Sequence, residues 1–142
     1  MDLAEQSAFS HLDDASIRRA AVRWLRPDER AWCAAQPSFR EALVIVLSCK
    51  EAVYKAWRAS GEVHDLSLSM HRCVGGRGRA VTVGSDPQVA ALWVVSNGSI
   101  LSLAAAAAAP AEGAWELLER ILRGLLPVPR PRGQASAARR AD

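Results

Sequence analysis

The apolar residues of this 142-residue chain change their spacing near Gly61, and this change constrains the fold more than any other feature. Before Gly61 they recur at helical intervals in Asp14–Leu25, in PDERAWCAA and over about Phe39–Ala59. After it, DLSLSMHRC and GRAVTV alternate apolar and polar residues, and QVAALWVVS and SILSLAAAA follow as further strands. Helices in one run and strands in the next predict an α+β fold, in which helices precede an antiparallel strand meander.

Three local signals indicate where these elements begin and end. Ser38 and Glu41 form a predicted capping box, in which each side chain bonds the other's backbone amide, so the long helix begins at about Phe39. Gly61 suits the left-handed conformation that follows a helix end. Asn97-Gly98 predicts a two-residue hairpin turn, because both positions of this turn need a positive φ.

The last part of the chain divides into a helix and a tail. Ala114–Leu125 has the apolar spacing of an amphipathic helix. The sequence after it, PVPRPRGQASAARRAD, is rich in Pro, Ala and Arg and has no apolar period, which is typical of disorder. We therefore expect one folded domain, residues 1–126, and a disordered tail, residues 127–142.

The charge and the cysteines narrow the class of protein. A formal charge of +3 and a pI near 9.1 are mildly basic and favour an anionic ligand or partner. The three cysteines have no metal-ligand spacing, and the sequence contains neither a secretory signal pattern nor a membrane-spanning apolar run. We expect reduced thiols, a cytoplasmic location and no membrane partner.

The stretch SCKEAVYKAW, residues 48–57, holds both lysines of a chain that otherwise uses sixteen arginines. Residues three, four and seven apart on a helix share a face, so Ser48, Glu51 and Lys55 lie in one stripe and Lys50 lies to its side. The plainest interpretation is a surface pair of Glu51 and Lys55, worth about 0.3–0.5 kcal/mol. The preceding residues ALVIVL are apolar, however, and charges on a buried helix are normally paired or functional. Both interpretations stay open on these residues alone.

The same stretch resembles the W-S-x-K-E-A-x-x-K motif of the 4′-phosphopantetheinyl transferase superfamily, in the form Leu47–Lys55. Met1–Glu5, MDLAE, resembles its G-x-D motif with a following acid, in a D-x-x-E spacing similar to that of the small holo-acyl-carrier-protein synthases. RWLRPDERAW resembles its R-F-[FL]-x-x-x-E segment, and VVSNGSILSLAAA resembles its closing hairpin. The resemblance covers roughly residues 1–108 and implies the fold of that superfamily.

The resemblance implies an enzyme that moves the 4′-phosphopantetheine arm of coenzyme A onto a serine of an acyl or peptidyl carrier protein, with release of 3′,5′-ADP. Such a reaction serves fatty acid or secondary metabolite biosynthesis. It needs Mg²⁺, which takes carboxylate and phosphate oxygens as ligands. The metal ligands implied are Asp2 and Glu51, with Glu5 as a third carboxylate.

The resemblance also implies contacts to coenzyme A from Ser48, Lys50 and Lys55. Lys55 lies one turn from Glu51 and suits phosphates as a flexible point charge. Glu51, or a metal-held water beside it, takes the proton of the incoming serine, so Glu51 and Lys55 are the implied catalytic residues. Two roles stay open for Lys50, a contact to phosphate or a pair with an acid.

Two departures from the superfamily pattern affect this interpretation. Leu47 stands where the motif often has Trp, and Met1 stands in place of the motif glycine, so we expect the strand leading into Asp2 to be missing. The superfamily binds coenzyme A between two similar domains. We therefore expect either a homo-oligomer or the second half of a longer protein.

An alternative from another class is a truncated or non-catalytic relative that acts as a basic protein- or nucleic-acid-binding module. Arg19, Arg23, Arg26 and Arg30 form a basic stripe along the first two helices. The stripe suits an acidic carrier protein or a plain solvated helix face. For the enzyme we expect coenzyme A and a carrier protein as partners, and no nucleic acid.

Overall fold

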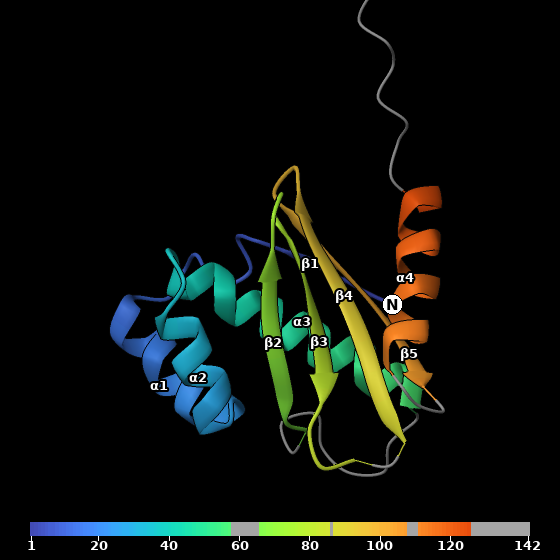
Figure 1. Ribbon diagram of the computed structural model, residues 1–142. Coiled ribbons are helices and arrows are strands. Elements are labelled where there is room, and N and C mark those ends of the chain that lie inside the picture. Colours follow the sequence, from blue (N-terminus) through green and yellow to red (C-terminus); the bar gives the residue numbers. More distant parts are fainter. Residues whose placement is uncertain (58–65, 86, 108–110, 126–142) are drawn as a thin grey trace, which may run out of the picture.

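The described part of the chain folds into a five-stranded antiparallel sheet with helices on both of its faces (Figure 1). The computed structural model describes residues 1–57, 66–85, 87–107 and 111–125. The α+β fold expected from the sequence is confirmed in this part of the chain. The elements in chain order are β1 (Asp2–Glu5), α1 (Asp14–Trp24), α2 (Pro27–Ala34), α3 (Phe39–Trp57), β2 (Leu68–Cys73), β3 (Arg77–Thr82), β4 (Gln88–Ser96), β5 (Ser99–Ala107) and α4 (Ala111–Leu125).

The strands are ordered β1-β5-β4-β3-β2, and each neighbouring pair is antiparallel. β2 to β5 follow one another as the expected meander. β1 comes from the start of the chain and pairs with β5, where Asp2 lies opposite Ser102 and Glu5 lies opposite Ser99. The first residues are thereby brought beside the last strand.

The sheet separates two apolar cores. We call the face towards α3 the inner face and the face towards α4 the outer face. In β4, Val89 and Trp93 belong to the inner core, whereas Leu92 belongs to the outer one. Burial on both faces explains why QVAALWVVS is almost continuously apolar. The α4 residues buried against the outer face are Ala114, Leu118 and Leu122.

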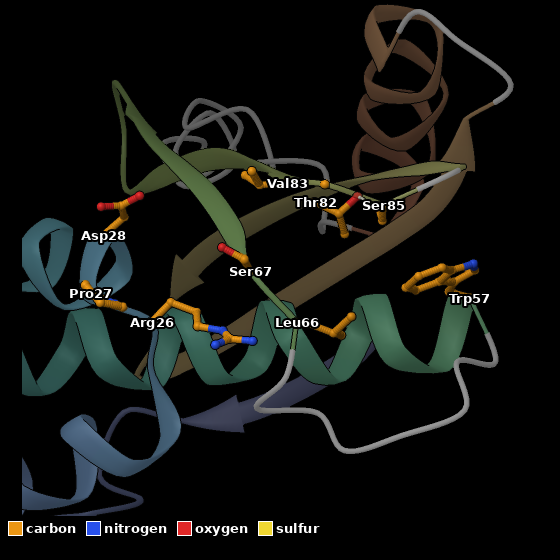
Figure 2. A pocket seen from close by; sticks show the side chains of 10 residues that line it. Arg26, Pro27, Asp28, Trp57, Leu66, Ser67, Thr82, Val83 and Ser85 are labelled. Carbon is orange, nitrogen blue, oxygen red and sulfur yellow. Dashed lines mark hydrogen bonds between the residues drawn. The ribbon is translucent and has the colours of Figure 1, made fainter.

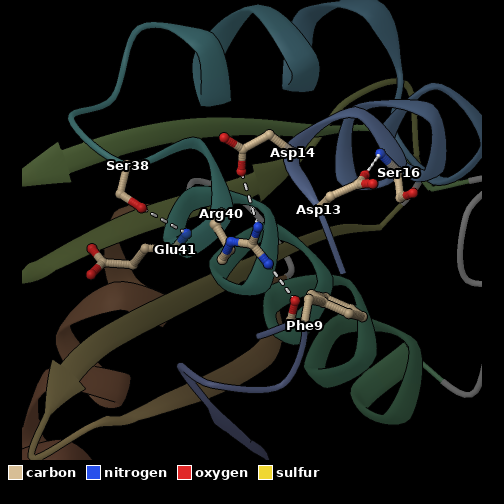
Figure 3. Close-up of polar contacts among 7 residues, drawn as sticks. All are labelled: Phe9, Asp13, Asp14, Ser16, Ser38, Arg40 and Glu41. Carbon is tan, nitrogen blue, oxygen red and sulfur yellow. Dashed lines mark hydrogen bonds and ion pairs between the residues drawn. The ribbon is translucent and has the colours of Figure 1, made fainter. Parts of the chain in front are cut away.

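The start of α3 has only one half of the expected capping box (Figure 3). The amide of Glu41 donates a hydrogen bond to Ser38 Oγ at 3.2 Å. The Glu41 carboxylate accepts a hydrogen bond from Gln6 Nε2 at 2.8 Å and lies 3.7 Å from the Arg72 guanidinium. The expected reciprocal bond is replaced by these contacts, because they offer the carboxylate a cation and a donor. Glu41 thus ties the segment after β1 to β2.

Arg40 links the loop after β1 to two helices. Its guanidinium donates to the Phe9 carbonyl and pairs with Asp14 at 3.0 Å (Figure 3). Asp13 caps α1, because its carboxylate accepts a hydrogen bond from the Ser16 amide at 2.6 Å. These contacts hold the starts of α1 and α3 side by side.

The remaining boundaries follow the sequence closely. α4 begins at Ala111, before the expected Ala114, and has Glu112 in its first turn, where a negative charge is favourable. The predicted helix end at Gly61 and the tail predicted to be disordered, residues 127–142, lie outside the described residues. Among the helices that the structure describes, none is long and apolar enough to cross a membrane.

The hairpin predicted at Asn97-Gly98 is confirmed. Asn97 has a φ of 51° and Gly98 a φ of 77°, so both turn positions are in the left-handed region. The amide of Gln6 bonds the Gly98 carbonyl at 2.9 Å. This hydrogen bond therefore joins the hairpin turn to the residue that follows β1.

The described strand at the start of the chain begins at Asp2 itself, and its four residues, Asp2–Glu5, pair with β5. β5 is the longer strand, and its pairing with β1 ends at Ser102. Beyond that point, Leu103–Ala107 have no partner strand on the β1 side within the described ranges.

Gly78 of β3 makes room for the ring of Trp93 in the inner core. A Cβ at this position would lie 2.3 Å from the Trp93 ring and 2.3 Å from the His71 carbonyl oxygen. The fully buried Trp93 ring meets Trp32 edge to face, with 6.3 Å between ring centres. The Arg72 guanidinium lies 5.1 Å from the Trp93 ring centre. Gly78 is thus a packing requirement of this core.

We expect Gly78→Ala to lower the free energy of unfolding by about 1–3 kcal/mol, the usual cost of overpacking a core. The matched control is Gly124→Ala on α4, where a Cβ would meet nothing within 4 Å. In that variant the free energy of unfolding stays equal or rises by up to about 1 kcal/mol, because alanine favours a helix. Urea unfolding measures both changes. Equal midpoints for the two variants would contradict the packing role of Gly78.

Candidate functional site

The residues that the sequence singles out meet where β1 packs against α3. Successive residues of a strand face opposite sides, and Ala4 of β1 packs in the inner core, so Asp2 also faces α3. Ser48 and Lys55 are two turns apart on α3 and both contact Asp2, with Glu51 between them on the same face. Edge pairing of β1 with β5 therefore brings the first residues of the chain to the middle of α3.

Asp2 is held by two side chains of α3. Ser48 Oγ donates a hydrogen bond to Asp2 Oδ2 at 2.9 Å, and Lys55 Nζ donates one to Asp2 Oδ1 at 2.8 Å. The Asp2 side chain is 16% exposed and the Lys55 side chain 52% exposed, so the ammonium lies on the solvent side of the pair. The hydrogen bond and the charge of Asp2 raise the pKa of Lys55, and the charge of Glu51 raises it further.

Glu51 lies one turn before Lys55 on α3. Its side chain is partly buried, and its charge acts on Lys55. Lys55 is therefore paired with Asp2 of β1, and the charge of Glu51 in its own helix also favours its ammonium form. α3 is helical over these residues, so Ser48, Glu51 and Lys55 share a face, and two of them, Ser48 and Lys55, contact Asp2.

Asp2 and Glu51 suit a magnesium ion. Mg²⁺ commonly takes one or two protein carboxylates and completes its shell with phosphate oxygens and water. The described residues contain no group of three or more His, Cys, Asp or Glu side chains arranged to hold a metal. A cationic group, the ammonium of Lys55, already lies on Asp2, which shows that this position attracts positive charge. The assignment of Asp2 and Glu51 as metal ligands stays a prediction.

Glu5 does not join this group. It lies an odd number of residues from Asp2 along β1, and strand alternation therefore places it on the opposite face with the exposed Leu3. Its carboxylate accepts a hydrogen bond from Ser7 at 3.4 Å. This corrects the expectation of a third carboxylate at the site. A D-x-x-E spacing brings two acids together on a helix, whereas a strand separates them.

Lys50 points away from Asp2, into the interior between α2, α3 and β2. Its Nζ lies 2.8 Å from Glu29 Oε2, and both side chains are fully buried. It also donates a hydrogen bond to the Trp24 carbonyl at 3.2 Å. Of the two roles left open for Lys50, this is the pair with an acid. Its expected contact to coenzyme A is corrected accordingly, because burial keeps the ammonium away from any ligand at the surface.

Glu29 is the residue that the sequence analysis did not single out. Its Oε1 accepts a hydrogen bond from the Leu68 amide at 2.8 Å, and its Oε2 accepts one from the Arg26 amide at 2.8 Å. Together with Lys50, it joins the start of α2, the middle of α3 and the start of β2. One signal was present in the sequence: Glu29 is the acid of the RWLRPDERAW segment.

Cys49 packs behind Asp2. Its Sγ lies 3.7 Å from the Oγ of Ser102, which is the residue of β5 opposite Asp2. Burial raises the pKa of the Cys49 thiol to about 12. Burial, and to a lesser degree the charge of Glu29, raises the pKa of the Cys33 thiol to about 12. Both thiols are therefore protonated at neutral pH and are not nucleophiles there.

A separate pocket of about 480 Å³ opens at the C-terminal end of α3 (Figure 2). It lies between Trp57, the residues before β2, the start of α2 and the residues after β3. Arg26 and Asp28 contribute one charge of each sign, and Thr82 Oγ1 already bonds Ser85 and a backbone amide. Asp2, Ser48, Glu51 and Lys55 do not line this pocket, so it is distinct from their group.

A comparison with protein-family models matches residues 1–104 to the 4′-phosphopantetheinyl transferase superfamily. The matched region runs from β1 into β5 and so includes both elements that build the site. The chain belongs to this superfamily, and its class is that of a transferase. A search of curated proteins found no match.

We expect Lys50→Met to lower the free energy of unfolding by about 3–5 kcal/mol, because it leaves the buried Glu29 carboxylate without its counter-charge. Glu29→Gln/Lys50→Met should cost less than the sum of the two single changes, because it removes both charges and leaves neither unpaired in the interior. Glutamine keeps one oxygen, which can accept one of the two backbone amides that the Glu29 carboxylate accepts. The control is Asp14→Asn, which removes a pair whose acid is 91% exposed and costs at most about 1 kcal/mol. Additive single changes in urea unfolding would contradict the buried pair.

The three cysteines allow a test of the burial of Cys33 and Cys49 in the inner core. We expect iodoacetamide to modify the exposed Cys73 in the folded chain, and Cys33 and Cys49 only after unfolding, as read by mass spectrometry. The raised pKa of each buried thiol contributes stability that is intact below the ordinary value of 9.0 and is lost as the pH rises towards about 12. Equal labelling of all three at neutral pH would contradict this.

Proposed function

We propose that this chain is a magnesium-dependent transferase that moves the phosphopantetheine arm of coenzyme A onto a serine of an acyl or peptidyl carrier protein. One observation carries the proposal: Asp2 of β1 and the Ser48–Glu51–Lys55 face of α3 meet at one point at the sheet edge. Membership of the superfamily supports the same reaction class.

Each residue of the group has a role that its position supports. Asp2 and Glu51 would hold Mg²⁺, which when bound neutralises the charge that develops on the pyrophosphate. Ser48, which is 2% exposed, fixes the orientation of the Asp2 carboxylate. The mobile ammonium of Lys55 binds the phosphates, and Glu51 accepts the proton of the incoming serine. A new serine oxygen–phosphorus bond then forms as the bond to 3′,5′-ADP breaks.

The partner surface that we propose for the carrier protein is the basic stripe of α1 and α2. Arg19, Arg23 and Arg26 are exposed and Arg30 is partly exposed. Such a surface favours approach of an acidic partner by charge complementarity. The exposure of these arginines supports the protein-binding role of the stripe, which was one of the two interpretations left open by the sequence.

The central test is Glu51→Gln, which removes a metal ligand and the proton acceptor with almost no change in volume. We expect transfer from coenzyme A to an apo carrier protein to fall more than about tenfold, which corresponds to about 1.4 kcal/mol of transition-state stabilisation. The readout is the mass of the carrier protein, with Mg²⁺ and with a chelator.

The matched control is Glu5→Gln, which removes the same charge from the opposite face of β1. We expect this variant to keep full activity. Retention of more than a tenth of the activity in Glu51→Gln, or equal losses in both variants, would overturn the assignment of Glu51.

A further inference from the structure

Both carboxylate oxygens of Asp2 are already engaged in the structure. Ser48 donates to Oδ2 from a buried position, and Lys55 places its ammonium 2.8 Å from Oδ1. Ser48 can stay where it is when another ligand approaches, because it leaves Oδ1 untouched. Lys55 cannot, because a metal ion on Oδ1 and an ammonium on the same oxygen repel each other.

We propose that Lys55 is a built-in cation that occupies the metal position on Asp2 and couples the binding of magnesium to the binding of coenzyme A. This inference rests on the proposed function and concerns the order of events at its site. Lys55 leaves Asp2 when the metal enters, and it then pairs with the phosphates that accompany the metal. The ammonium thus exchanges one anionic partner for another.

The charges at the site explain why each ligand needs the other. Asp2, Glu51 and Lys55 sum to −1, from two negative charges and one positive charge. Mg²⁺ alone changes this sum to +1 and removes the counter-ion of Lys55. Phosphates alone meet two carboxylates and a lysine that is already neutralised. When both ligands are bound, Mg²⁺ neutralises the two carboxylates and the phosphates neutralise Lys55. Each ligand therefore strengthens the binding of the other, which is positive coupling.

The residue type at position 55 suits this exchange. The Lys55 side chain is 52% exposed, so it has room to swing away from Asp2. Lysine presents a compact charge on a flexible stem, whereas arginine would grip a carboxylate with two parallel hydrogen bonds. The chain uses arginine for sixteen of its eighteen basic residues and lysine here. The other lysine, Lys50, is fully buried.

The experiment is calorimetric titration of Mg²⁺ into the full chain, with and without coenzyme A and in the absence of a carrier protein. In the unaltered chain we expect coenzyme A to tighten Mg²⁺ binding about tenfold, within the usual range of coupling between ligands. In Lys55→Met we expect Mg²⁺ alone to bind about tenfold more tightly than to the unaltered chain, and coenzyme A to add little. Lys55→Gln serves as a second neutral variant.

The control is Arg123→Met, which removes one exposed positive charge from α4 on the outer face. It should leave Mg²⁺ binding and its coupling unchanged. Unchanged or weaker Mg²⁺ binding in both Lys55 variants, while the unaltered chain binds both ligands, would overturn this inference alone. An unaltered chain that binds neither Mg²⁺ nor coenzyme A would overturn the proposed function as well.

Discussion

The buried ion pair of Lys50 and Glu29 fixes the orientation of α3, and the site depends on that orientation. Both side chains are fully buried with 2.8 Å between Nζ and Oε2, so rotation of the helix would leave an unpaired charge in the interior. Glu29 is itself fixed by the amides of Arg26 and Leu68. Successive helical residues advance by about 100°, so a Lys50 held towards α2 turns Ser48 and Lys55 towards β1.

The two lysines of the chain therefore have different tasks. Lys50 is a structural cation, surrounded by protein and satisfied by Glu29 and the Trp24 carbonyl. Lys55 is a half-exposed cation paired with the partly buried carboxylate of Asp2. A compact ammonium suits both places, because the first has little room and the second requires movement, whereas a planar guanidinium needs more acceptors in a fixed geometry. The acid between them, Glu51, belongs to the surface group.

Much of the fold was predictable because local patterns determine it. The helical period of Phe39–Trp57, the alternation in β2 and β3, and the positive φ that Asn97-Gly98 requires each depend on neighbours within a few residues. The predicted hydrogen bond from the Ser38 amide to the Glu41 side chain is not formed, because distant residues and not near neighbours decide the partners of that carboxylate. Gln6 and Arg72 reach the Glu41 carboxylate from distant parts of the chain and replace its local partner.

For the site, the sequence by itself determined that Ser48, Glu51 and Lys55 share a face, because helical geometry alone brings them together. Only the tertiary structure decided what meets that face. Asp2 reaches Ser48 across 46 positions of sequence because β1 pairs with β5 at the sheet edge. Glu5 is excluded because a strand turns alternate residues to opposite faces, and Lys50 is drawn inward by an acid in another helix. Local periodicity carries no information about such partners, since they follow from how the layers pack.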